Sequence, residues 1–252
     1  MNDKEGCLSR AAELISNKHF TEALCELREL DPSWDDGPVV EMRGLAYFGV
    51  ADYEQATTAL EIASLLIPLG VEAQCRLAAC YMRSRRREVA SVIYVYLACL
   101  EALPEVIAEE VAGGLSRLGK NEMTLQFCRA QIKRFKVSHK LFSVAAESMR
   151  RLDYPDEEIL VFAFQAYQLC PSSVPYRIVF ATHLVRCNRL GQASKVLREI
   201  DVDALRCVAL LQRVCAVFHS LNDSEGVRCC QARLTQIGYE VSTTYRPPKE
   251  KE

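Results

Sequence analysis

A small residue followed three positions later by a large apolar residue recurs seven times along the chain, at intervals of 33 to 35 residues. The small residues are Ala11, Gly44, Ala78, Ala112, Ala146, Ala181 and Cys215, and their large partners are Leu14, Tyr47, Tyr81, Leu115, Met149, Leu184 and Phe218. A fixed period of this length indicates one supersecondary unit repeated as a solenoid, an architecture that presents surfaces for binding. The period therefore predicts an array of seven similar repeats.

Each repeat has room for two helices, because a second series follows the small residues by twelve positions, or thirteen in the fifth repeat: Ala23, Ala56, Ala90, Thr124, Ile159, Ala193 and Val227. A small side chain lets two helix axes approach closely, and a large neighbour one turn away fills the groove beside it. Glycine and proline are sparse and punctuate the pattern, and no run alternates as a strand would. The sequence predicts an all-α fold.

These residues resemble the tetratricopeptide repeat family. The second repeat fits best, and the third follows it, with Gly44, Tyr47, Tyr53, Ala56, Leu60, Ala63 and Pro68 in the second and Ala78, Tyr81, Ala90, Tyr94 and Leu97 in the third. The resemblance covers roughly residues 5 to 237 and implies a right-handed α-α superhelix whose first helices line a concave groove. The family's large aromatic residue early in the first helix is absent, so a more divergent superhelix of helical hairpins stays open.

The repeats predict one elongated domain over residues 1–237, closed by a terminal helix with an apolar stripe and an outer face of Arg228, Gln231, Arg233 and Gln236. A polar outer face is what the last unit of a solenoid requires for solubility. Gly238 should end that helix. Residues 238–252, with Pro247 and Pro248, are predicted to form a flexible tail.

Composition narrows the class of protein. The 252 residues are half apolar with a net charge of −2, which argues against sequence-wide nucleic-acid binding. We expect no secretory signal and no membrane span, since the amino terminus is charged and no apolar stretch is long enough. The twelve cysteines are scattered without the spacing of a disulfide framework, which favours a reducing, cytoplasmic compartment.

Groove-lining side chains follow from the face of each first helix that points away from its partner. In the first three repeats this face is apolar and includes Leu8, Ile15, Leu45, Phe48 and Met82; in the middle of the chain it is charged and includes Arg83, Arg117, Lys140, Glu147, Arg150 and Arg151. An open apolar trough would hold a helix or an extended segment of a partner, with the charged row fixing its register. Alternatively, tight curvature buries the apolar row as core.

Two further features could be surfaces or ordinary structure. The helix expected over Val89–Leu100 is apolar on nearly every side, so a second copy of the chain could cover one flank and form a homodimer; the alternative is a broad internal core. Arg83, Arg85, Arg86 and Arg87 crowd one turn. We interpret them as a solvated turn near a helix C-terminus, since the sequence shows no aromatic stacking platform beside them.

The sequence gives little support to catalysis, a cofactor or a metal. The four histidines, His19, His139, His183 and His219, are far apart and have no metal-ligand spacing, and no glycine-rich phosphate loop or placed nucleophile is visible. The leading hypothesis is a non-catalytic scaffold or adaptor that binds a peptide or helix of a partner protein. A chaperone for a secreted or aggregation-prone client, or an accessory subunit of a larger complex, remains an alternative.

Overall fold

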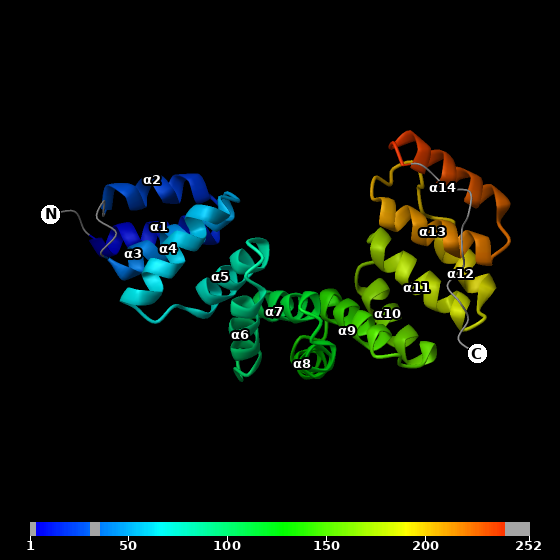
Figure 1. Ribbon diagram of the computed structural model, residues 1–252, viewed down its shortest axis with the longest axis horizontal. Coiled ribbons are helices and arrows are strands. Elements are labelled where there is room, and N and C mark those ends of the chain that lie inside the picture. Colours follow the sequence, from blue (N-terminus) through cyan, green and yellow to red (C-terminus); the bar gives the residue numbers. More distant parts are fainter. Residues whose placement is uncertain (1–3, 31–35, 240–252) are drawn as a thin grey trace. The chain divides into compact units, whose positions relative to one another are not determined.

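A computed structural model describes residues 4–30 and 36–239 of the chain. Across these residues fourteen α-helices and no strand are found: α1 (Lys4–Ser16), α2 (Phe20–Leu30), α3 (Gly37–Gly49), α4 (Tyr53–Leu66), α5 (Val71–Arg83), α6 (Arg87–Ala98), α7 (Glu105–Arg117), α8 (Asn121–Arg134), α9 (His139–Arg151), α10 (Asp156–Leu169), α11 (Val174–Arg186), α12 (Leu190–Leu197), α13 (Val208–Ser220) and α14 (Ser224–Gln236). In six of the seven repeats the two consecutive helices pack against each other: α1 with α2, α3 with α4, α5 with α6, α9 with α10, α11 with α12 and α13 with α14. Figure 1 shows the helices following one another along the chain. The predicted all-α class with two helices per repeat is confirmed.

The chain divides into two compact units, Met1–Gln131 and Ile132–Glu252. In the first unit, the first helices of neighbouring repeats lie side by side: α1 packs on α3, α3 on α5 and α5 on α7. In the second unit, α11 packs on α13 in the same way. The first helices of neighbouring repeats therefore adjoin one another from α1 to α7 and again at α11 and α13, as the resemblance implies.

The repeated small residues are where the helices meet. Six of the seven are buried, and Cys215 is half-buried against the core of the second unit. In the second series, Ala23, Ala56, Ala90, Thr124 and Ala193 are completely buried. The packing argument that predicted two close-approaching helices per repeat is thus confirmed by burial at both of its small positions.

One turn geometry joins the two helices of all seven repeats. The residue seven positions after the small residue has a left-handed backbone in every repeat: Lys18, Ala51, Arg85, Gly119, Asp153, Asn188 and Asn222, with φ between 56° and 77°. The next residue donates its N–H to the carbonyl oxygen of the large residue of the pair at 2.8–3.1 Å, as His19 does to Leu14. This six-to-one hydrogen bond is the Schellman ending of a helix, so the same motif ends every first helix.

Side-chain caps and prolines begin several helices. Asp52, Ser138 and Asp223 each accept a hydrogen bond from a backbone N–H in the first turn of α4, α9 and α14, which satisfies a donor that the helix itself leaves unpaired. Pro38 and Pro175 lie in the first turns of α3 and α11, where a missing N–H costs nothing. Side-chain caps and first-turn prolines therefore favour the start of these helices at the observed residues.

The terminal helix agrees with its predicted pattern except at one residue. Cys230 and Leu234 of α14 are buried, and Gly238 follows the helix with a φ of 79°. Arg233, expected on the outer face, instead donates from Nε to the carbonyl oxygen of Leu205 at 2.9 Å and is half-buried. The tail predicted from residue 238 lies outside the described residues from 240 onward, so its flexibility and the domain boundary at residue 237 stay predictions.

Candidate functional site

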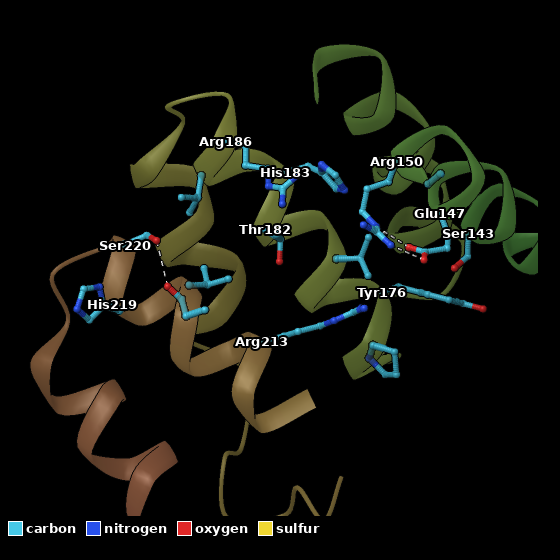
Figure 2. Close-up of a pocket in the computed structure, with 16 residues that line it drawn as sticks. Ser143, Glu147, Arg150, Tyr176, Thr182, His183, Arg186, Arg213, His219 and Ser220 are labelled. Carbon is cyan, nitrogen blue, oxygen red and sulfur yellow. Dashed lines mark hydrogen bonds and ion pairs between the residues drawn. The ribbon is translucent and has the colours of Figure 1, made fainter. Parts of the chain in front are cut away.

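The second unit carries a hollow of about 620 Å³ on the faces of its first helices. Side chains from three helices line this hollow, and Figure 2 shows them as sticks. The lining residues are Ser143, Ala146, Glu147 and Arg150 on α9, Pro175, Tyr176, Val179, Thr182, His183, Val185 and Arg186 on α11, and Arg213, Ala216, Val217, His219 and Ser220 on α13. Their three- and four-residue spacing is that of one helix face. The hollow is a continuous surface built from the first helices of the last three repeats.

The lining combines an apolar strip with polar side chains. Val179 and Val185 are half-buried and pack against a core that includes Phe180 and Leu184. The hydroxyl groups of Thr182 and Ser220 donate to backbone carbonyl oxygens four residues earlier, at 2.8 and 3.0 Å. Because these hydroxyl hydrogens are directed into their own helices, neither residue is poised as a nucleophile.

The carboxylate of Glu147 binds the guanidinium groups of two arginines at one side of the hollow. Arg150 donates to it from Nε at 2.9 Å and from Nη2 at 2.7 Å, and Arg151 donates from Nε at 2.9 Å. The hydrogen bonds from Arg150 are the main reason that the pKa of Glu147 is lowered. Figure 2 shows the paired contacts between Arg150 and Glu147. This carboxylate is therefore ionised and already occupied.

His183 is a buried polar residue in the lining of the hollow. Its side chain is nearly inaccessible, and Nδ1 lies 2.7 Å from Oδ1 of Asp156 in α10. The same oxygen lies 3.5 Å from Nη1 of Arg186. Burial lowers the pKa of His183, Arg186 and Arg150 act in the same direction, and Asp156 opposes them. His183 is therefore neutral at neutral pH, with the Asp156 carboxylate accepting from Nδ1–H.

This burial predicts a pH dependence of stability. The pKa of His183 in the native state lies below its ordinary value of 6.5. Neutral His183 therefore contributes to stability at a pH above 6.5, and this contribution is lost as the pH falls through the native pKa. We expect the unfolding temperature of wild type to fall more steeply between about pH 7.5 and pH 5 than that of His183→Gln. Thermal unfolding followed by circular dichroism measures this, with the exposed His219→Gln as control; equal slopes for wild type and His183→Gln would contradict it.

The residues predicted from the first three repeats lie on adjoining helices of the first unit. Leu8 and Ile15 on α1, Leu45 and Phe48 on α3, and Met82 on α5 are all half-buried. Phe48 meets the Tyr53 ring edge-on at 5.4 Å, and the Arg76 guanidinium lies 5.1 Å from the Phe48 ring centre. The row is thus partly covered by its own neighbours, and its role in partner binding stays a prediction.

The predicted charged residues have different surroundings. Arg83 stacks on the Tyr53 ring at 3.9 Å, and the backbone carbonyl of Arg117 accepts from Arg87 at 2.8 Å. Lys140 is exposed on α9. Of the eleven residues predicted to line the groove, two, Glu147 and Arg150, line the hollow.

The arginine-rich turn is more structured than predicted. Besides Arg83 on Tyr53, Arg86 lies 4.3 Å from the Tyr81 ring centre and pairs with Glu61 at 2.7 Å. The expectation that no aromatic platform adjoins this turn was wrong: Tyr53 comes from α4, and Tyr81 lies in the last turns of α5, just before the arginines. The guanidinium groups already cover both rings.

The helix predicted to bind a second copy buries one face and exposes another. In α6, Ala90, Tyr94 and Leu97 are buried, whereas Val92 is 70% and Tyr96 54% exposed. Self-association through this outer stripe stays a prediction. All twelve cysteines are free thiols. Among the described residues, no cluster of three or more histidine, cysteine or acidic side chains could hold a metal ion, and no helix is both long and apolar enough to cross a membrane.

The comparisons with known proteins bear on the fold. No protein-family model matches the sequence, and the curated proteins give no match. Among solved structures, PilF of Pseudomonas aeruginosa has a TM-score of 0.66 at 13% identity, covering 80% of this chain and 91% of its own. The C-terminal part of a TPR repeat-containing protein of Cytophaga hutchinsonii has a TM-score of 0.62 at 11% identity, covering 92% and 95%.

A third similar structure is YrrB, described as a TPR protein with an unusual peptide-binding site. It has a TM-score of 0.54 at 16% identity, and the match covers 66% of this chain and 85% of YrrB. Identities this low bear on the fold and leave the activity open. Together with the seven repeated hairpins, they show that the chain has the tetratricopeptide-repeat fold.

Proposed function

We propose that this chain is a non-catalytic scaffold that binds a segment of a partner protein in the hollow of the second unit. The observation that carries this proposal is a cavity of about 620 Å³ lined by side chains from α9, α11 and α13. Its size is that of a ligand site, and its apolar strip with separated polar groups is the usual composition of one. A short helix or an extended segment fits such a surface.

The chemistry of the lining favours binding over reaction. The acidic residue that faces the hollow, Glu147, is held by Arg150 and Arg151. His183 is buried on Asp156, and the hydroxyl groups of Thr182 and Ser220 donate to their own helices. A general base must have its substrate's proton within hydrogen-bond reach, and each of these groups is already hydrogen-bonded within the protein.

Filling the hollow should abolish binding. Ala216 is half-buried on α13 and lines the cavity, so Ala216→Trp would place an indole ring where the partner segment lies. The matched control is Ala232→Trp, because Ala232 is exposed on α14 and does not line the hollow. We expect peptides selected on wild type from a displayed random library to lose at least about tenfold in affinity for Ala216→Trp and to keep their affinity for Ala232→Trp.

Fluorescence polarisation with the selected peptides measures these affinities, and circular dichroism checks that both variants stay helical. Selected peptides that bind Ala216→Trp as tightly as wild type would place the binding surface elsewhere. A library from which wild type enriches no peptide would count against the proposal itself.

A further inference from the structure

The charges around the hollow are unequal. Three arginines line it, Arg150, Arg186 and Arg213, against one carboxylate, Glu147. Arg150 shares Glu147 with Arg151, and Arg186 lies near Asp156 of α10, which also holds His183. The acidic groups at the hollow are therefore taken up by Arg150, Arg151, Arg186 and His183.

Arg213 differs from the other two arginines. It is exposed on α13, and within the described residues its guanidinium group has no ion pair, hydrogen bond or ring contact. Figure 2 shows its side chain extending from α13 toward the part of the hollow where Tyr176 lies. A guanidinium carries five donors in a planar fork suited to a carboxylate, so Arg213 offers an unused anion-binding group at the wall of the cavity.

The apolar strip lies beside this cation. Val179 and Pro175 of α11, and Ala216 and Val217 of α13, line the same cavity as Arg213. A polyanion such as RNA would need further cations or stacking rings to follow its backbone, whereas the strip suits apolar side chains. A peptide that presents an acidic residue next to an apolar one satisfies both the guanidinium and the strip.

From this charge complementarity we infer that the hollow selects an acidic segment of its partner, with an aspartate or glutamate side chain bound by Arg213 and an adjacent apolar side chain on the strip. This inference rests on the proposed function and adds the chemistry of the partner. Arg150 and Arg151 share the single carboxylate of Glu147, so a second positive charge remains at the same surface.

A reversal of charge tests the selection. Displayed random peptides are selected in parallel on wild type, Arg213→Glu and Arg206→Glu; Arg206 is exposed just before α13 and does not line the hollow. We expect wild type and Arg206→Glu to enrich peptides with aspartate or glutamate beside apolar residues. We expect Arg213→Glu to enrich lysine or arginine at that position, a change that misfolding would not produce.

A double-mutant cycle then assigns the contact. Replacing the acidic residue of the best peptide by its amide should weaken binding to wild type about fivefold and leave binding to Arg213→Gln unchanged, as measured by fluorescence polarisation. Arg213→Lys keeps the positive charge and should retain part of the preference.

The possible outcomes separate the two proposals. Enriched peptides without an acidic preference, or the same preference in Arg213→Glu, would overturn the inference and leave the proposed function standing. Failure of wild type to enrich any peptide would remove both. Tighter binding of a single-stranded RNA oligonucleotide than of any acidic peptide, lost in Arg213→Gln, would overturn it in favour of nucleic acid.

Discussion

Replacing Leu115 by alanine should lower the free energy of unfolding by about 2–5 kcal/mol. Leu115 is the large residue of the fourth small–large pair, and its side chain is completely buried on α7. Its removal takes apolar surface out of the core and leaves a cavity that rigid helices close only in part. The midpoint of urea unfolding, followed by circular dichroism, measures the loss.

The small partner tests the same packing from the other side. Ala112 is also completely buried on α7, so Ala112→Leu forces extra volume between helices and should cost about 1–3 kcal/mol. The double variant Ala112→Leu/Leu115→Ala restores the total volume but exchanges its positions. We expect it to be no more stable than Leu115→Ala, because a close axis-to-axis contact requires the small residue at position 112.

Val106 provides the control on the same helix. It is 57% exposed, so Val106→Ala should change the stability by less than about 0.5 kcal/mol. A double variant with wild-type stability would show that only core volume matters here, and the packing explanation of the 34-residue period would then be wrong.

The fold was predictable from the sequence because its determinants recur in register. Each helix pair needs a small side chain at the contact and a large one a turn away, and both types are visible at fixed intervals. The turn between the helices was not predictable in this way. Lys18, Ala51 and Arg85 have the left-handed backbone that Gly119 also has, and these residues share no side-chain type. Their conformation is imposed by the Schellman hydrogen bond and the packed helices.

The sequence predicts only some of the residues that line the hollow. The register that gave Leu45 and Phe48 in the second repeat also gives Thr182 and Val185 in the sixth, and Ala216 and His219 in the seventh; all four line the hollow. The predicted groove residues cover the first five repeats only, so these four residues are not among them. The lining at Tyr176 and Arg213 lies at other positions of the repeat, since the exposed face is wider than three positions.

The sequence pattern does point to Arg186, because an arginine recurs at the end of several first helices. Arg83, Arg117, Arg151 and Arg186 are the last residues of α5, α7, α9 and α11, a position where the helix dipole favours a positive charge. The partners of such residues could not be predicted. Asp156 and His183 are separated by 27 residues along the chain and meet only because α10 packs on α11.

Two neighbouring glycines of α7 should respond to alanine with opposite signs. A Cβ added at Gly114 would lie 2.5–2.6 Å from ring atoms of Tyr94, whose side chain in α6 is 1% exposed. A buried aromatic ring yields little, so we expect Gly114→Ala to lower the free energy of unfolding by about 1–3 kcal/mol.

A Cβ at Gly113 would meet only the guanidinium group of Arg117, at 3.5 Å or more, which is ordinary contact. Because alanine is the better helix former, Gly113→Ala should raise the free energy of unfolding by about 0.5–1 kcal/mol. The two substitutions share helix, residue types and sequence neighbourhood, so the difference in their urea midpoints isolates the contact with Tyr94. If both substitutions stabilised the protein, Tyr94 of α6 would not lie as close to Gly114 of α7 as the structure has it.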